Sequence, residues 1–205
     1  KAAEKNLDHD AALSGAIGAS QHVVLPFFFV LGGPVLLDSA ALDPVLARNS
    51  VSFSDPPDLV TARELIPPVT EFSAAALALG HINLVADSDG AVRNDALLID
   101  YGGRVFPSLS LQLSLKYLGY DLKDLVIGDE LRFRKIRIPV HDRGRMLISY
   151  SNSYEAYPFV EVLNNRVAPE LFKNKIVIVA PTATGLGTMQ VTPIAMPSAH
   201  IHELI

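Results

Sequence analysis

Residues 175–180 read Lys-Ile-Val-Ile-Val-Ala, and no other segment restricts the fold as much. Successive side chains of a strand point to opposite sides, so the apolar residues of this run would occupy both faces. Strands that are buried on both faces belong to sheets that helices cover on both sides. The run therefore predicts a layered fold in which this segment lies in the middle of a sheet.

The rest of the chain alternates between helical and strand patterns, which is typical of an α/β protein. Helices are expected at residues 11–20, 71–79, 107–117 and 158–165, with a shorter turn near 169–172. Asp8 or Asp10 would cap the first helix, Gly80 would end the second, and the third, which the leucine spacing indicates, would end at Gly119. Strands are expected at residues 21–30, 81–86, 91–101, 131–138 and 146–150. Residues 32–68 carry six of the fourteen prolines and predict a loop. The expected fold class is α/β: a layered, central, mostly parallel (mixed) sheet flanked by helices, with β-hairpin excursions.

Composition excludes several classes of function. The net charge is −5 and the lysines and arginines are scattered, so no basic stripe is available for a nucleic acid. The absence of cysteine excludes thiol catalysis, thiolate metal sites and disulfides. The most apolar run, residues 22–33, is too short to span a membrane and contains Pro26. Because the first residue is lysine, we expect a fragment whose targeting and anchoring segments lie elsewhere.

The loop after residues 175–180 is the expected ligand site, because ligands of open α/β sheets sit beyond the carboxyl ends of strands. Its candidate residues are Thr182, Thr184, Gly185 and Gly187, with His202 as a further candidate. The glycines would let backbone N–H groups approach an anion. The loop lacks the spacing of a dinucleotide or P-loop motif, so a plain connecting loop is the favoured alternative.

Three other groups of residues suggest chemistry, and each has a simpler interpretation. Asp87 and Asp89 resemble the start of a calcium loop, but the twelfth position is Leu98, so a hairpin turn is favoured. His200, His202 and Glu203 could bind zinc from a strand, although structural histidines are commoner. The adjacent His141 and Asp142 could be a base and its orienting group, but a solvated turn is favoured. We expect no catalytic residue, no metal and no cofactor.

Several motifs occur in a set order. They are residues 10–13 with 23–26, Gly-His-Ile-Asn at 80–83, Asp-x-Asp-Gly-x-Val-Arg at 87–93, Phe-Pro-Ser-Leu-Ser at 106–110, residues 138–150, residues 159–163, and a closing block from 173 to 202. Taken in this order, they resemble the type 2 CHASE (CHASE2-like) family of bacterial sensor domains. The likeness spans about residues 8 to 205.

The resemblance implies a single extracytoplasmic sensor domain over residues 1–205, an N-terminally incomplete fragment of a larger receptor. It implies a position on the periplasmic or extracellular face of the bacterial inner membrane, with flanking transmembrane helices outside this fragment. The cytoplasmic output would be an adenylate or diguanylate cyclase, a histidine kinase or a Ser/Thr kinase. The ligand, a small molecule or a protein, is unknown, and a homodimer is a further candidate assembly.

The chain also departs from the family pattern. Thr188 replaces an aspartate, Ser198 replaces a glycine, Ala180 replaces the glycine that ends a strand, and the family's opening strand is missing. The first two changes predict that a ligand site at this loop is altered or lost. Two alternatives to a sensor stay open: an α/β enzyme acting on a small polar substrate, and a structural assembly domain that pairs through exposed apolar residues such as 27–29.

Overall fold

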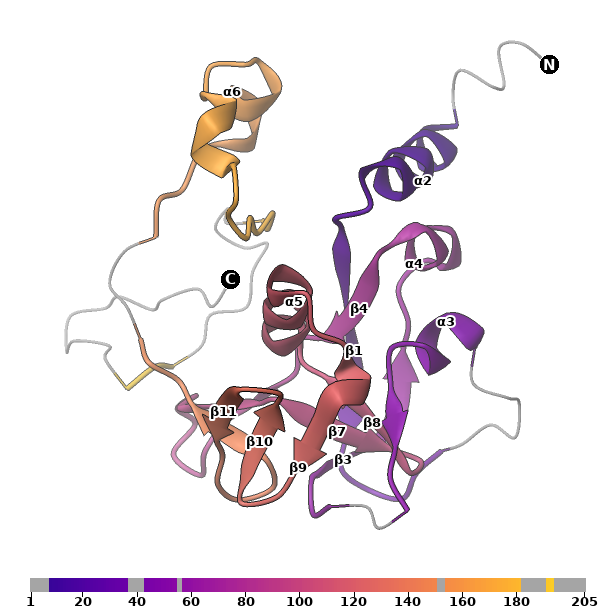
Figure 1. The fold of residues 1–205 in the computed structure, drawn as a ribbon, viewed down its shortest axis with the longest axis vertical. Helices are drawn as coiled ribbons and strands as arrows, with labels where there is room; N and C mark the ends of the chain where they lie inside the picture. Colours follow the sequence, from indigo (N-terminus) through magenta and orange to yellow (C-terminus); the bar gives the residue numbers. More distant parts are fainter. Residues whose placement is uncertain (1–7, 37–42, 55–56, 151–153, 182–190, 194–205) are drawn as a thin grey trace. The chain divides into compact units, whose positions relative to one another are not determined.

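The computed structural model describes residues 8–36, 43–54, 57–150, 154–181 and 191–193 (Figure 1). The chain divides into two compact units. Unit 1 comprises Lys1–Val85 and Asp95–Met146, and unit 2 comprises Ala86–Asn94 and Leu147–Ile205. The expectation that residues 1–205 act as one domain stays a prediction.

A six-stranded mixed sheet forms the centre of unit 1, in the order β2-β8-β7-β3-β1-β4. Its β1–β4 and β3–β7 pairs are parallel, and its other pairs are antiparallel. The predicted mixed α/β class is confirmed. The strands are β1 (Val24–Leu31), β2 (Val51–Ser52), β3 (Val60–Ile66), β4 (Ala78–His81), β7 (Leu98–Tyr101) and β8 (Arg104–Pro107).

The described residues also form two smaller, three-stranded sheets. One has the order β11-β10-β9 and the other β12-β6-β5. Asn94, at the start of β6, and Leu147, at the end of β12, are assigned to unit 2, so the division between the units falls within these two strands. The strands are β5 (Leu84–Val85), β6 (Asn94–Ala96), β9 (Leu125–Ile127), β10 (Glu130–Phe133), β11 (Ile136–Pro139) and β12 (Arg145–Leu147).

Helices α2 and α5 of unit 1 begin at residues that are suited to capping. The side chain of Asp8 accepts a hydrogen bond from the Ala11 N–H at the start of α2, and Ser108 does the same for Leu111 in α5. Gly119 ends α5 at φ 70°, as predicted. The helices are α2 (His9–Ser20), α3 (Pro44–Ala47), α4 (Thr70–Ala75), α5 (Leu109–Leu118) and the short η1 (Leu122–Asp124); unit 2 contains α6 (Phe159–Leu163) and η2 (Pro169–Phe172).

The sheet of unit 1 has an apolar cluster on each face, because alternate residues of its strands point to opposite sides. Ile99 and Phe106 belong to one cluster, which also takes in side chains of α2, α3 and α4. Their neighbours Leu98 and Val105 belong to the other cluster, with α5 and the small β9–β10–β11 sheet. Figure 1 shows α5 on the opposite side of β1 and β4 from α3 and α4.

Strand β1 changes partners halfway along its length. Val24 to Phe27 pair with β4, and Phe28 to Leu31 pair with β3. Pro26 is tolerated because the first half of β1 has a strand neighbour on only one edge. Past the end of β4, the side-chain amide of Asn83 accepts a bond from the Phe29 N–H (2.8 Å) and donates one to the Phe29 carbonyl (2.7 Å). One side chain thus takes the place of a further strand residue.

The prediction of a central strand at residues 175–180 is wrong. The structure has no strand there, and Ile176, Val177, Ile178 and Val179 are 44–76% exposed. A strand forms only beside a hydrogen-bonded neighbour, and an apolar pattern does not supply one. The described residues show no strand paired with this segment.

Two other predictions are corrected in unit 1. Residues 32–68 are more than a loop, since they contain α3, β2 and β3, and β3 joins β1 to β7 in the middle of the sheet. The helix predicted at 71–79 ends at Ala75, and Gly80 lies inside β4 rather than at the end of a helix. A Cβ on Gly80 would lie 2.6 Å from the Leu109 Cα, so Gly80 is required by the close approach of α5.

Candidate functional site

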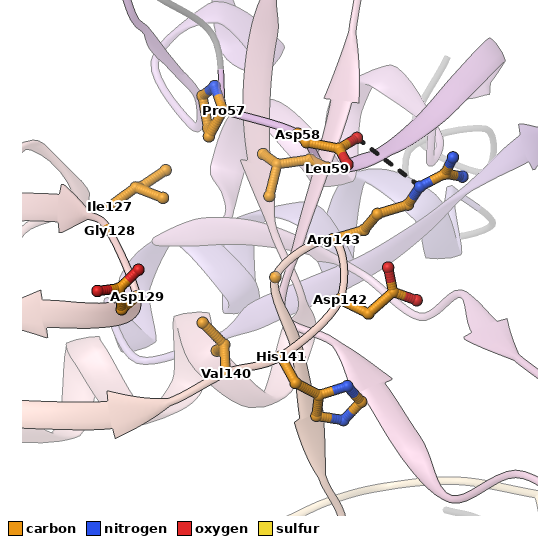
Figure 2. A pocket seen from close by; sticks show the side chains of 11 residues that line it. Pro57, Asp58, Leu59, Ile127, Gly128, Asp129, Val140, His141, Asp142 and Arg143 are labelled. Atoms are coloured by element: carbon orange, nitrogen blue, oxygen red, sulfur yellow. Dashed lines mark ion pairs between the residues drawn. The ribbon is translucent and has the colours of Figure 1, made fainter.

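A cavity of about 400 Å³ lies in unit 1, lined by residues 57–59, 127–129 and 140–144 (Figure 2). Residues 57–59 lead into β3, residues 127–129 are the end of β9 and its turn into β10, and residues 140–144 connect β11 to β12. The cavity is therefore built at the ends of strands, from connecting segments that come together only in the folded chain.

The turn between β11 and β12 is held in place by its backbone. The backbone groups of His141 and Arg145 bond to each other in both directions, at 2.9 and 3.0 Å. Arg143 and Gly144 both have positive φ, at 57° and 70°. A Cβ on Gly144 would lie 2.6 Å from the Leu59 Cδ2, so the turn is packed directly on the buried Leu59.

The charged side chains around the cavity differ in how they are neutralised. Arg143 pairs with Asp58 at 3.7 Å between Nε and Oδ1, and both side chains are more than half exposed, so this pair adds little stability. Asp142 forms an ion pair with Arg145. The Asp129 carboxylate makes no hydrogen bond or ion pair within the described residues. Asp129 is therefore the carboxylate left available to a ligand.

The other lining residues supply apolar surface. Leu59 is buried, while Ile127 and Val140 are half-buried. The lining thus combines these apolar side chains with a larger polar surface. The arrangement suits a small ligand that places an apolar part on these three side chains and a hydrogen-bond donor or cation on Asp129.

His141 and Asp142 are both exposed, and Figure 2 shows their side chains pointing in different directions. Since Asp142 pairs with Arg145, it does not orient the imidazole for proton transfer. The preferred interpretation of this pair, a solvated turn, is confirmed.

The Asp-x-Asp-Gly motif in unit 2 forms a turn closed by an arginine. The Gly90 N–H donates to the Asp87 carbonyl at 2.9 Å, and Gly90 has φ 82°. The Arg93 guanidinium donates to both carboxylate oxygens of Asp89, at 2.8 and 2.7 Å, and to Asp87 at 3.0 Å. The predicted hairpin turn is confirmed, and both carboxylates that a calcium ion would need are bound by Arg93.

This pairing also affects proton binding. Hydrogen bonds from the Arg93 side chain and from the Ala91 backbone N–H hold the pKa of Asp89 well below its usual range. The hydrogen bonds from Asp89 and Asp87 raise the pKa of Arg93. Nearby, the Tyr150 hydroxyl donates to the Val92 carbonyl at 2.5 Å, and the Ile148 N–H donates to the Arg93 carbonyl. The motif therefore fixes the backbone of residues 87–93 within unit 2.

A third polar cluster lies at the start of α5. The Ser110 hydroxyl donates to Asp95 at 2.5 Å, and the Ser108 and Ser110 hydroxyls are 2.8 Å apart. Burial raises the pKa of Asp95, and the hydrogen bonds from Ser110 and Ser108 oppose that rise. Because Ser108 also caps α5, we assign this cluster to the positioning of the helix.

The residues predicted for the ligand site lie outside the described part of the chain. These are Thr182, Thr184, Gly185, Gly187 and His202, and the same holds for Thr188, Ser198, His200 and Glu203. Sequence reasoning recognised the turn at 142–144 but missed the cavity. Its three lining segments are far apart along the chain, and no local pattern indicates that they meet.

Within the described residues, no group of three or more His, Cys, Asp or Glu side chains is placed to hold a metal ion. The helices of the described ranges are all too short or too polar to cross a membrane. A family model described as "CHASE2 domain" matches residues 2–204. No curated protein and no solved structure matches the chain.

Proposed function

Because the chain belongs to the CHASE2 family, whose members are sensory domains of receptors, we propose that it is the extracytoplasmic sensor of a bacterial transmembrane receptor. In this role it binds a small-molecule or protein ligand and passes the signal to a cytoplasmic adenylate or diguanylate cyclase, histidine kinase or Ser/Thr kinase. The observation that carries the proposal is the match over residues 2–204, essentially the whole chain. CHASE2 is a sensory family and not a catalytic one, which supports a binding role over an enzymatic one.

A ligand transmits a signal only if it binds one of two arrangements of a receptor more tightly than the other. The cavity of unit 1 is a suitable place for such binding, since its walls come from three separate connecting segments. A ligand that contacts all three would restrain their relative positions. The predicted loop at residues 182–187, together with His202, is the second candidate site.

A thermal-shift screen of the purified chain with small polar compounds, cationic ones included, tests the binding role. A ligand selective for the native state raises the melting temperature. For any compound that does so, Asp129→Asn should abolish the shift if the cavity is the site, and Thr184→Val should abolish it if the loop is. Asp10→Asn, the same change on the exposed start of α2, should leave the shift intact.

The receptor role itself needs the full-length protein in membranes. The compound should change the activity of the output module, and the variant that abolishes binding should abolish that response. An output that ignores every compound bound by the domain would contradict the sensor role. Turnover of the compound by the isolated chain would favour the enzyme instead.

A further inference from the structure

We propose that acid opens unit 1 at strand β4, with His81 as the group that takes up the proton. This inference goes beyond the receptor role and requires no ligand. His81 ends β4, which is an edge strand of the six-stranded sheet. Its side chain is 1% exposed.

The surroundings of the imidazole are aromatic. Its ring lies 6.4 Å from the ring of Phe27 and 6.0 Å from that of Phe29, measured between centroids. Phe106 packs against both phenylalanines, at 5.9 and 5.4 Å. Among the residues that the structure describes, neither ring nitrogen of His81 has a hydrogen-bond partner. Such a site accommodates a neutral ring and offers no hydrogen-bond acceptor to an imidazolium, whose two N–H groups would be buried without a partner.

The strands packed against His81 bring it no opposite charge. β1 has no titratable residue between Val24 and Leu31, and His81 is the one titratable residue of β4. On β7, the ring of Tyr101 packs against Phe29 in a tilted arrangement, and the Asp100 carboxylate accepts from the Gly103 N–H. Arg63 and Glu64 belong to β3, which β1 separates from β4 in the sheet.

Two arginines, one after α3 and one in β8, are engaged elsewhere. Arg48 donates to the carbonyls of Ser73 and Ala76, and Arg104 donates to Ser50 and to the Ala47 carbonyl. Glu71, in the first turn of α4, is exposed. Asp95 accepts from Ser108 and Ser110, and Ser108 forms a parallel bridge with His81.

Burial lowers the pKa of His81 from 6.5 to about 3. A histidine whose pKa is lower in the folded chain than in the unfolded chain makes unfolding easier as the pH falls below the unfolded value. The stability is intact above pH 6.5 and is lost progressively between pH 6.5 and about 3. Asp95 acts in the opposite sense, because its raised pKa favours the folded state as the pH falls. Since edges of sheets open at lower free energy than their centres, the proton should act first on β4.

The test compares the whole chain with His81→Phe, which keeps an aromatic ring in the pocket, and with His9→Gln, which changes an exposed histidine of α2. Urea unfolding is measured for each protein at about pH 7.5 and about pH 4.5. As the pH falls between these values, protonation of His81 alone should raise the equilibrium constant for unfolding about 100-fold. In His81→Phe, the unfolding constant should rise about 100-fold less over the same pH range. In His9→Gln, it should rise as much as in the parent chain.

Two readouts on the parent chain keep the proposal testable even if His81→Phe does not fold. Hydrogen exchange at the amides of β4 should lose protection below about pH 6.5 before the amides of β7 do. By NMR, the His81 ring should stay neutral in the folded chain down to about pH 4.5. A ring that titrates near 6.5 in the folded state, or equal pH dependence in the parent and His81→Phe, would overturn the proposal.

Discussion

In unit 1, one side chain makes the pair of hydrogen bonds that the backbone of a neighbouring strand usually makes. Asn83 bonds both the N–H and the carbonyl of Phe29, the residue at which β1 has passed the end of β4. A buried backbone group that loses its partner destabilises a protein more than an average hydrogen bond stabilises it. Asn83 therefore stabilises the second half of β1 from outside the sheet.

We expect Asn83→Ala to lower the free energy of unfolding by about 1–3 kcal/mol, because both polar groups of Phe29 lose their partner. Denaturant unfolding at neutral pH measures the effect. The same substitution at the exposed Asn164 should change the stability by less than about 0.5 kcal/mol. Equal losses in the two variants would contradict the role given to Asn83.

The Asp89–Arg93 pair makes a prediction about pH at the residue scale. Because the pKa of Asp89 is depressed in the folded chain, the pair stabilises unit 2 above the ordinary aspartate pKa of 3.8. That contribution is lost as the pH falls through the lower folded value. In Arg93→Ala the pKa of Asp89 should rise toward 3.8.

Carboxyl-carbon NMR of Asp89 measures this change directly. Arg166→Ala, which removes the ion pair with Glu161 in the same unit, should leave Asp89 unchanged. An Asp89 that titrates identically in the parent chain and in Arg93→Ala would show that the bidentate pair does not persist in solution.

At the scale of elements, the packing of β4 against α5 depends on the missing side chain of Gly80. A methyl group there would meet the Leu109 backbone at 2.6 and 2.8 Å and the Ser108 carbonyl at 2.9 Å. These are backbone atoms at the capped start of a helix, and they move only if the helix moves. The sequence showed a glycine suited to ending a helix, but the structure uses it for a close approach.

We expect Gly80→Ala to destabilise the chain by about 1–3 kcal/mol or more through overpacking. Gly15 in α2 is the matched control, because a Cβ added to it would meet no atom within 4 Å. Gly15→Ala should stabilise the chain by about 0.5–1 kcal/mol, because alanine favours a helix. Thermal unfolding of both variants shows whether each one is stabilised or destabilised. An unchanged stability of Gly80→Ala would refute the close approach.

For the molecule as a whole, the main unexpected feature is the exposed apolar run at residues 176–179 in unit 2. A central strand there would make a charge very costly, whereas the exposed segment of the structure tolerates one. Val179 is 76% exposed and Val92, in the same unit, is fully buried. The two valines therefore separate the two arrangements.

We expect Val179→Asp to change the free energy of unfolding by less than about 0.5 kcal/mol. Val92→Asp should cost more than about 3 kcal/mol, because it buries a charge without a partner. Denaturant unfolding followed by circular dichroism measures both changes. A large loss of stability in Val179→Asp would instead support the buried strand that the sequence predicts.

The sequence predicted those parts of the fold that local chemistry decides. Leucine spacing and Gly119 located α5, Asp8 indicated the start of α2, and the turn residues 87–90 indicated their hairpin. It also carried the ordered motifs by which the family was recognised, now supported over residues 2–204. For the ligand site, the residues predicted from sequence lie outside the described chain, so that prediction stays open.

What the sequence determined by itself was the α/β class, the caps of α2 and α5, the hairpin turn at 87–90, and membership of a sensory family, since each depends on residues close together in the chain or on their order. Only the tertiary structure decided that β3 joins the centre of the sheet, that Gly80 faces α5, and that three distant segments line a cavity. It likewise left residues 176–179 exposed. The reason is physical: burial and strand pairing depend on partners far along the chain. A local apolar pattern shows that a segment could be a buried strand, but it does not specify the strands or helices that the segment packs against.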